Sequence, residues 1–510
     1  MPAIRELLLE AFQPSLKDNE ALVDAILGSS ADLKKRKFAL GGDTAVSGLL
    51  YYVAGLADSK VVELILRALV VQYRESHREK EGPETADDIV TGLLSNASAK
   101  SCSKAEEAIT SVLTGDTLVM IEGVGEAIVV VSRGWEDRSI EEPVAENNVR
   151  GPRDGFTESI RTNTAHVRRR LRDPRLRFDE MVVGERSKTD VNIAYIEDLV
   201  KEGLVEEVKR RIGRIRIDAV LESSYIEELI EDEPLSPLNT VQNTERPDKV
   251  ASALLEGRVA IFIDNTPSVL LVPTFFWQYI QASDDYYNHY WVGTFYRIVR
   301  YVALIISLVL PSIYVMLISF HHEMIPTSLA LTIASGREVV PFPVLLEALL
   351  MELAFELMRE AGIRMPKPIG QAVSIVGSLI IGQAAVQAGI VSPFMVIIVA
   401  ITGISSFAIP SYSSSLAIRI IRFPLLIASG TLGLLGFATV FFALMLHALS
   451  IRSFGESYLA PASPFRARDQ RDMVLRMPMW MLDGRPNFAQ DEDRIGGRQR
   501  PKPPTPTEKG

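Results

Sequence analysis

The sequence predicts an α/β duplicated soluble N-terminal region followed by an all-α polytopic transmembrane domain. Acidic charge is concentrated in residues 1–290, which hold 35 Lys and Arg against 50 Asp and Glu, whereas residues 291–450 hold 8 against 6. Four apolar stretches lie in the second region, and the first region repeats one order of strand, turn and helix signals. The predicted domains are copy one at residues 1–140, copy two with an Arg-rich helix at 141–290, the transmembrane domain at 291–450 and a basic tail at 451–510.

The duplication is read from two matching series of segments. "KRKFAL", "VSGLLYYVAGL" and "DSKVVELILRALVVQ" have the strand, strand and helix patterns of the later "RFDEMVV", "VNIAYIEDL" and "VKEGLVEEVKRRIG". Gly41 matches Gly184 at an offset of 143 residues, and Gly115 matches Gly257 at an offset of 142. A nearly constant offset across separate blocks predicts two copies of one α/β module.

The segment Gly151–Arg177 carries eight arginines in a chain of net charge -10. The offset aligns it with a helix of acidic balance in copy one, so the fold alone does not require the arginines. Neighbouring arginines on a helix point in different directions and cannot share one internal partner. They are explained by a solvated face, by anionic lipid headgroups, or by the acidic copy of a neighbouring subunit. We favour the subunit contact, with the candidates Arg161, Arg168, Arg169, Arg170 and Arg172.

A nucleic-acid partner is not expected. The first 290 residues are acidic as a whole, and aromatic residues do not interleave with the arginines. A polyanion needs a basic face larger than one helix.

The second half is predicted to cross a lipid bilayer. Tyr301–Phe320 contains no charged residue and has the length of about 20 residues that spans a bilayer core. Further apolar stretches are Ile369–Val391, Pro393–Ile409 and Phe423–Leu449, the last thinned by Gly430, Gly433 and Gly436. With these four spans the tail returns to the cytoplasm. If Val344–Glu360 is counted as a fifth span, the tail lies on the other side of the membrane. The positive charges in the loops do not decide between the two topologies.

The segment "VLLEALLMELAFELMRE" places carboxylates on an apolar helix. At about 100° per residue, Glu352, Glu356 and Glu360 form one stripe, and Glu347 lies off it. A carboxylate facing hydrocarbon is costly, so the stripe should face water, a pore or a partner charge. It suits an amphipathic helix in the membrane interface, or acidic rings that favour cations in an oligomer. The pore-lining candidates are Glu352, Glu356, Glu360 and Glu347, and the helix-packing candidates, four residues apart, are Gly370, Ser374, Ser378 and Gly382.

No catalytic residue, metal site or cofactor is expected. Phosphate-loop, dinucleotide and zinc motifs are absent from the sequence, and adjacent His321 and His322 do not share a helical face. The single cysteine, Cys102, excludes an intramolecular disulfide and fits a reducing compartment. The first 20 residues lack the pattern of a signal peptide, so the N-terminal part is expected to be cytoplasmic.

Three segments together resemble the A subunit of the GerA family of spore germinant receptors. They are "RGPRDGFTESIRTNTAHVRRRLRDP", "GERSKTDVNIAYIEDLV" and "SPFRARDQRDMVLRMPMWMLDGRP". The resemblance runs from about residue 30 to about residue 490. It extends equally to a paralogue, the F-type protein of the SpoVA operon. The Pro- and Lys-rich end "RQRPKPPTPTEKG" is expected to be disordered.

The resemblance implies a multi-pass protein of the inner membrane of dormant spores, with its N-terminal part facing the cytoplasm. It implies a permease-like B subunit that senses nutrients, a C-subunit lipoprotein, and a homo-oligomeric ring that releases monovalent cations. In the paralogue, a similar ring would amplify the germination signal. A non-conducting scaffold is the alternative, and a monomeric transporter ranks last because the apolar half shows no inverted repeat.

Overall fold

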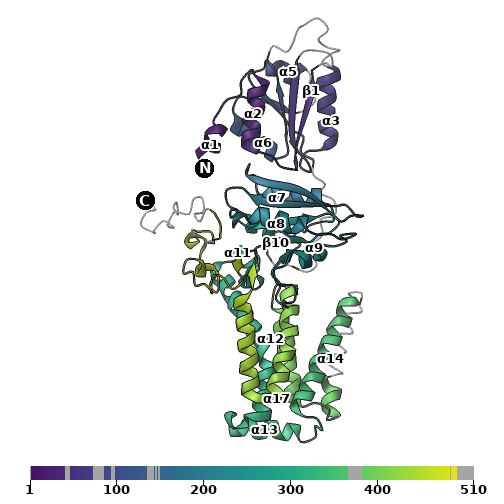
Figure 1. Ribbon diagram of the computed structural model, residues 1–510, viewed down its shortest axis with the longest axis vertical. Helices are drawn as coiled ribbons and strands as arrows, with labels where there is room; N and C mark the ends of the chain where they lie inside the picture. The colour runs from purple at the N-terminus through teal and green to yellow at the C-terminus, as the bar shows by residue number, and fades with distance from the viewer. Residues whose placement is uncertain are drawn as a thin grey trace, which may run out of the picture. The chain divides into compact units, whose positions relative to one another are not determined.

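The computed structural model describes residues 2–40, 46–72, 85–92, 98–134, 143, 146, 150–365, 382–482, 484–486 and 488–490. Outside these residues lie Gly41, three of the four helix-packing candidates (Gly370, Ser374 and Ser378) and the end of the tail that the sequence predicts to be disordered. The chain forms two compact units. The first consists of Met1–Glu231, Val241–Pro273 and Asp483–Gly510, and the second of Asp232–Thr240 and Thr274–Leu482 (Figure 1).

The first unit contains two five-stranded antiparallel sheets with equivalent strand orders. The order is β1-β2-β4-β5-β3 in copy one and β6-β7-β9-β10-β8 in copy two. In each copy the third strand along the chain, β3 or β8, lies at the edge of the sheet and pairs with the fifth, β5 or β10. The two copies therefore have the same order of connections, including the one that is not sequential. The predicted duplication is therefore confirmed.

The elements of copy one are α1 (Pro2–Leu8), α2 (Leu16–Leu27), β1 (Leu33–Ala39), β2 (Ser47–Val53), α3 (Ser59–Arg67), the π-helical turn η1 (Ala68–Gln72), α5 (Ala86–Gly92), β3 (Ala99–Cys102), α6 (Ala105–Leu113), β4 (Thr117–Ile121) and β5 (Ala127–Val130). Those of copy two are α7 (Ile160–Arg170), β6 (Leu176–Val183), β7 (Thr189–Ile196), α8 (Leu204–Gly213), α9 (Ser223–Ile230), β8 (Gln242–Thr244), α10 (Pro247–Leu255), β9 (Val259–Ile263) and β10 (Val269–Val272).

Matching turns show that the two copies agree in local detail. The turn between β4 and β5 contains Gly123 at φ 86°, and the turn between β9 and β10 contains Asn265 at φ 68°. Glycine and asparagine are the residues that adopt positive φ most readily. Each donates its backbone N–H to a residue just ahead of the first long helix of its copy, Gly123 to Pro14 and Asn265 to Glu158, both at 2.8 Å.

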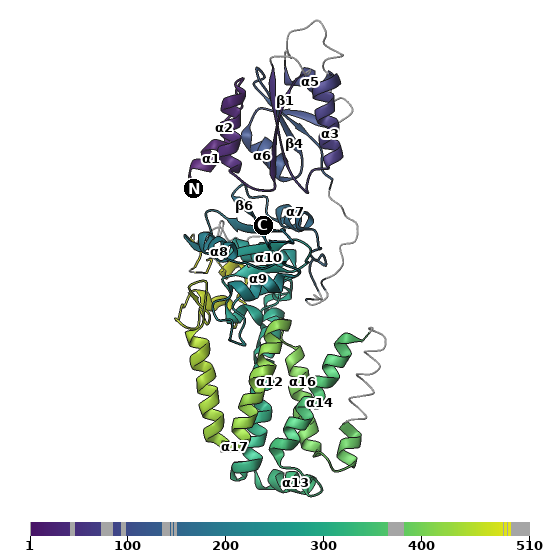
Figure 2. The same cartoon turned by 45° about the vertical axis from the view of Figure 1, so that its right-hand side comes forward.

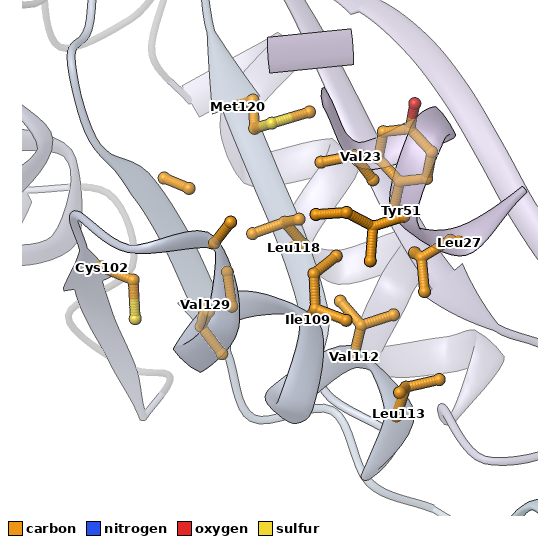
Figure 3. Packing of buried hydrophobic residues seen from close by; sticks show 14 of the residues in the cluster. Val23, Leu27, Tyr51, Cys102, Ile109, Val112, Leu113, Leu118, Met120 and Val129 are labelled. Carbon is orange, nitrogen blue, oxygen red and sulfur yellow. The ribbon is translucent and has the colours of Figure 1, made fainter. Parts of the chain in front are cut away.

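Copy one buries both faces of its sheet. Successive residues of β2 point to opposite faces, so that Leu49 and Tyr51 join the core beneath α2 and α6, and Leu50 joins the core beneath α3 and α5. Figure 3 shows the first of these cores, with Val23 and Leu27 of α2 beside Tyr51. A strand covered on both faces is apolar throughout, which explains why "SGLLYYV" lacks the alternation of a half-exposed strand.

The second unit is mainly helical. Its long helices are α12 (Tyr290–Phe320), α13 (Thr327–Arg337), α14 (Val344–Arg364), α16 (Pro393–Phe407) and α17 (Tyr412–Ser450), preceded by η2 (Phe276–Tyr279) and α11 (Asp284–Tyr287) and interrupted by η3 (His322–Met324). Among the described residues, α12 and α17 are long and apolar enough to cross a membrane, and α16 is a shorter apolar helix. These three contain most of three predicted spans, and the fourth, Ile369–Val391, begins outside the described residues.

The prediction of one continuous span over Phe423–Leu449 is wrong, because α17 breaks at Gly433. The backbone there has φ 60° and ψ −137°, which is not helical and which glycine adopts without a Cβ clash. The chain turns back at this residue, so residues 412–432 and 434–450 form two arms (Figures 1 and 2). A Cβ built on Gly436 would collide with the Ala428 carbonyl oxygen, whereas eight residues of straight helix span about 12 Å.

Gly433→Ala is expected to lower the stability of the helical unit by about 1–3 kcal/mol, the range for a non-glycine residue held in a sparsely populated conformation. Its Cβ would also lie 3.0 Å from atoms of Phe320 and His321. The measurement is the thermal unfolding midpoint of the chain purified in detergent. Gly382→Ala is the control, because its Cβ would make an ordinary 3.6 Å contact with Val396, and alanine favours helix. Equal midpoints for the two variants would contradict the strained turn.

The chain that follows α17 packs against the start of α12. This part contains β11 (Arg452–Ser453), β12 (Glu456–Ser457), η4 (Asp469–Asp472) and η5 (Met479–Met481). Arg297, which is 0% exposed, donates to the carbonyl oxygen of Asp472 at 2.6 Å and to its carboxylate at 2.9 Å. The carboxylate of Asp285, which is also fully buried, forms ion pairs with Arg297 Nε at 3.2 Å and with Arg300 Nη1 at 2.7 Å. Residues 451–482 are therefore an integral part of the helical unit.

Candidate functional site: a buried charge cluster among the apolar helices

Five charged side chains from α14 and α17 meet inside the helical unit. Glu352 and Glu356, one turn apart on α14, both face Arg422 of α17, whose Nη2 lies 3.0 Å from Glu352 Oε2 and 3.2 Å from Glu356 Oε1. Arg419 lies one turn from Arg422 and places Nη1 2.8 Å from Glu356 Oε2. Arg359 of α14 approaches Glu356 to 3.9 Å. We call these five residues the charge cluster.

The charge cluster is removed from solvent. The Glu352 and Arg422 side chains are each 1% exposed, Arg419 is 6% exposed, and Glu356 is 24% exposed. Three guanidinium groups face two carboxylates, so one positive charge is left in excess. Burying ionised groups is costly unless they are paired, and the pairing therefore holds α14 against the first arm of α17.

The guanidinium group of Arg359 has contacts beyond the two carboxylates of the charge cluster. Arg359 Nη2 donates to Ser406 Oγ of α16 at 2.8 Å. Its guanidinium lies over two aromatic rings, 4.9 Å from the centroid of Phe355 and 4.5 Å from that of Phe407. Stacking on aromatic faces stabilises a cation that has lost its water. Arg359 thereby ties α14 to α16 as well.

Glu347 occupies a second buried site, away from the charge cluster. Its Oε1 accepts hydrogen bonds from the backbone N–H and from the hydroxyl of Ser392, both at 2.6 Å. Ser392 is the N-cap of α16, and a carboxylate there is stabilised by the helix dipole. Arg337 of α13 lies 3.5 Å from the other carboxylate oxygen. The side chain of Glu347 is 0% exposed.

The structure therefore divides the four predicted pore-lining glutamates. Glu352 and Glu356 share one stripe and face partner charges, Glu347 faces α16, and Glu360 is 57% exposed and pairs along the helix with Arg364. A pore-lining role stays a prediction for all four. Sequence reasoning missed the three arginines as their partners, although a charged residue on an apolar helix already signals that a partner is needed.

The arginine helix α7 packs between the two copies of the α/β module. Ala165 belongs to the core of copy one, and Val167 belongs to the core of copy two. Arg168, 3% exposed, binds Asp32 of copy one through two hydrogen bonds, Nε to Oδ2 at 2.9 Å and Nη2 to Oδ1 at 3.1 Å. Arg177 donates to the carbonyl oxygen of Leu27 at 2.6 Å and so adds a second link between the copies.

Several arginines of this segment thus have partners within the chain. Arg168 binds Asp32, and Arg170 binds Asp154 at 2.5 Å, so no neighbouring subunit is needed to neutralise these two. Each guanidinium reaches a different carboxylate because adjacent helix positions point in different directions. The subunit contact stays a prediction for the exposed members, Arg161, Arg169 and Arg172.

Asp154→Asn is expected to destabilise the first unit by about 1–3 kcal/mol at pH 7, since a hydrogen-bonded charge is lost. Burial acts to raise the pKa of the Asp154 carboxyl, but His166, 3.3 Å away, and Arg170 lower it far below its ordinary value. A lowered pKa stabilises the fold above the ordinary pKa of 3.8, and this contribution is lost as the pH falls through the folded-state pKa.

The measurement for Asp154 is the urea midpoint of parent and variant at pH 7 and pH 3. The difference between them should shrink at pH 3. Asp218→Asn serves as the control, because Asp218 is 81% exposed and lies 3.9 Å from Arg186. If the urea midpoints of parent and Asp154→Asn differ by the same amount at pH 7 and pH 3, the stabilising charge does not reside on Asp154.

Comparisons with known proteins were made for the whole chain. A family model described as Bacillus/Clostridium GerA spore germination protein matches residues 21–488. The chain is 42% identical to "Spore germination protein KA" of Bacillus subtilis (strain 168), over 96% of this chain and 90% of that protein. It is 41% identical to "Spore germination protein GerLA" of Bacillus cereus, over 92% and 94%. It is 33% identical to "Stage V sporulation protein AF" of Bacillus subtilis (strain 168), over 97% and 99%.

Among solved structures, a match is the crystal structure of the N-terminal domain of the A subunit of the Bacillus megaterium spore germinant receptor GerK3. It is 30% identical in sequence, covers 52% of this chain and 98% of that domain, and has a TM-score of 0.42.

Proposed function

This chain belongs to the Bacillus/Clostridium GerA spore germination protein family, and we propose that it is the membrane subunit of a germination complex and forms an oligomeric, nutrient-gated channel for monovalent cations. The family assignment confirms the resemblance predicted from the sequence motifs. Relatives named as spore germination proteins match over nearly their whole lengths.

The charge cluster is the observation that carries the channel proposal. Ionisable residues on membrane helices are rare, and substrate and ion pathways are among the functional sites that they mark. Here two carboxylates and three guanidinium groups lie between α14 and α17, and α17 is one of two helices among the described residues that are apolar and long enough to cross a bilayer. In the proposed mechanism, nutrient binding separates the arginines from Glu352 and Glu356, and the freed carboxylates then attract cations.

The proposed ring uses an exposed apolar face of α14 that lies beside the face of Glu352 and Glu356. Leu346, Leu350, Leu353 and Leu357 are between 41% and 63% exposed, and they recur at spacings of four and three residues. This spacing is that of a helix packed against other helices. Glu360, three residues after Leu357, is an exposed carboxylate at the end of this row of leucines, and Glu347 lies toward the other end of α14. Copies gathered around one axis would pack these leucines against neighbouring copies and set Glu360, with the freed Glu352 and Glu356, along a central path.

The proposed complex contains a permease-like B subunit that senses nutrients and a C-subunit lipoprotein, in the inner membrane of the dormant spore. The N-terminal unit faces the spore core. The paralogous alternative, a ring that amplifies the signal, follows from the similarity to "Stage V sporulation protein AF". The identity to that protein, 33%, is lower than the 42% to "Spore germination protein KA", which favours the receptor subunit.

A non-conducting scaffold is the second candidate. The observation that favours it is that each carboxylate of the charge cluster already has an arginine partner in the same chain. In that case the cluster only fastens α14 to α17.

Cation flux separates the two candidates. The chain with Glu352→Gln and Glu356→Gln, reconstituted with its partner subunits in liposomes, is expected to lose about an order of magnitude of nutrient-triggered K⁺ flux, because the carboxylates supply the cation attraction. Glu338→Gln removes an exposed carboxylate of the same unit and is the control. The mass of each solubilised complex verifies assembly. Unchanged flux in an intact complex, or rings that pass no current at all, would favour the scaffold.

A further inference from the structure

We propose that residues 469–482, here called the tail segment, lie in the headgroup region of the membrane, with their exposed apolar side chains turned toward the lipid. The inference rests on α12 crossing a bilayer, as proposed above. It goes beyond that proposal by assigning a lipid-binding surface to the chain that follows the last helix.

The depth of the tail segment is set by hydrogen bonds to α12. The carbonyl oxygen of Arg476 accepts from Thr294 Oγ1 at 3.1 Å, and that of Met473 accepts from Tyr301 Oη at 3.0 Å. The two donors are seven residues apart, which is about 10 Å along a helix. The tail segment therefore runs beside the first turns of α12, and Met473 lies at the level of Tyr301.

Tyr301 marks the level at which hydrocarbon is expected to begin. The run Tyr301–Phe320 is free of charge, and its 20 residues match a hydrocarbon core of about 30 Å. Just ahead of it, Trp291 and Phe295 are 68% and 61% exposed. Exposed aromatic side chains gather at the headgroup level of membrane proteins. Because Arg476 is held at the level of Thr294, the residues after Met473 are placed within the headgroup region, at the level of Trp291 and Phe295.

The side chains of the tail segment are sorted by polarity. Two of its charged groups, Asp472 and Arg476, point inward: Asp472 binds the buried Arg297 and also accepts from Tyr286 Oη at 2.7 Å. Arg476 is 5% exposed and lies over the ring of Tyr286. The outward side chains are apolar, between 37% and 58% exposed: Val474, Leu475, Met479 and Met481. An apolar outer face on a short segment at this depth is typical of interfacial anchors.

Lipid is the occupant that fits this surface, because the apolar exposure continues along the helix on which the tail segment packs. Ile298, Val302 and Ile305 of α12 are 42%, 50% and 60% exposed. A bilayer would cover these residues and the outer face of the tail segment together. Arg471, exposed on the same segment, can reach the headgroups while its stem stays with the apolar side chains.

The test is spin-label accessibility of the full chain in lipid nanodiscs. Leu475→Cys and Met479→Cys are made separately in a Cys102→Ser background, which removes the natural thiol, and each is labelled with a nitroxide. Ile305→Cys reports the proposed span, and Leu221→Cys, at a residue 70% exposed in the first unit, reports water. Relaxation by oxygen measures access from lipid, and relaxation by a neutral nickel chelate measures access from water.

At Leu475 and Met479 the ratio of oxygen to nickel relaxation should be several-fold higher than at Leu221 and lower than at Ile305, as expected of a headgroup position. A ratio equal to that at Leu221, with Ile305 still in lipid, would overturn the tail proposal and leave the membrane span intact. Exclusion of both agents at Leu475 and Met479 would show a protein contact there and would also overturn it. A water-like ratio at Ile305 would instead refute the membrane assignment of α12, and the tail proposal with it.

Discussion

Arg422→Gln should destabilise the helical unit by about 3–5 kcal/mol, the range for a buried ion pair that loses one partner. Arg422 lies between the carboxylates of Glu352 and Glu356 and is 1% exposed. Without it, Glu352 keeps its burial and loses the only cation within 4 Å that the described residues provide. The expected result is a clear fall in the thermal midpoint of the chain in detergent or nanodiscs.

A double substitution distinguishes the missing charge from a general packing defect. Adding Glu352→Gln to Arg422→Gln removes the stranded carboxylate, so at least half of the lost stability should return. Arg364→Gln is the matched control. It breaks the pair between Arg364 and Glu360 on α14, in which the arginine side chain is 79% exposed. If Arg422→Gln is no more harmful than Arg364→Gln, the charge cluster does not hold α14 to α17.

The second large effect is expected at the contact between the two copies. Asp32→Asn leaves the buried guanidinium of Arg168 without its carboxylate, and the loss is again expected to be about 3–5 kcal/mol. Cys102 provides the measurement, because it is the single cysteine of the sequence and is 2% exposed in copy one. Its labelling by a thiol reagent in increasing urea should begin at a lower urea concentration in the variant.

Adding Arg168→Met to Asp32→Asn should recover part of this loss, since a buried charge is replaced by an apolar chain of similar length. Lys100→Met is the control, because its pair with Glu107 is more than half exposed on both sides and exposed pairs contribute little. Labelling of Cys102 that is the same in parent and in Asp32→Asn would show that the copies do not depend on this pair.

Features that depend on local pattern were predictable from the sequence. The duplication was visible because each copy repeats its turns and strands at nearly one offset, down to Gly115 and Gly257, which both adopt positive φ. The stripe of Glu352 and Glu356 follows from helix periodicity, and the structure directs both side chains toward Arg422.

The partners could not be predicted, because periodicity gives the direction of a side chain and says nothing about which distant element it meets. Arg422 is 70 residues from Glu352, and Asp32 is 136 residues from Arg168. The turn at Gly433 was missed for a different reason. A glycine in an apolar run is usual at helix contacts, and only the backbone angles show that this one reverses the chain.

The packing of Asp472 on Arg297 has a consequence for how the polypeptide threads a bilayer. The start of α12 and the chain beyond α17 are joined by this contact, so they must lie on one side of any membrane that the helices cross. A polypeptide that leaves on the side where it entered makes an even number of passes. For a chain that spans a bilayer, we therefore expect an even number of passes and not the five-pass arrangement.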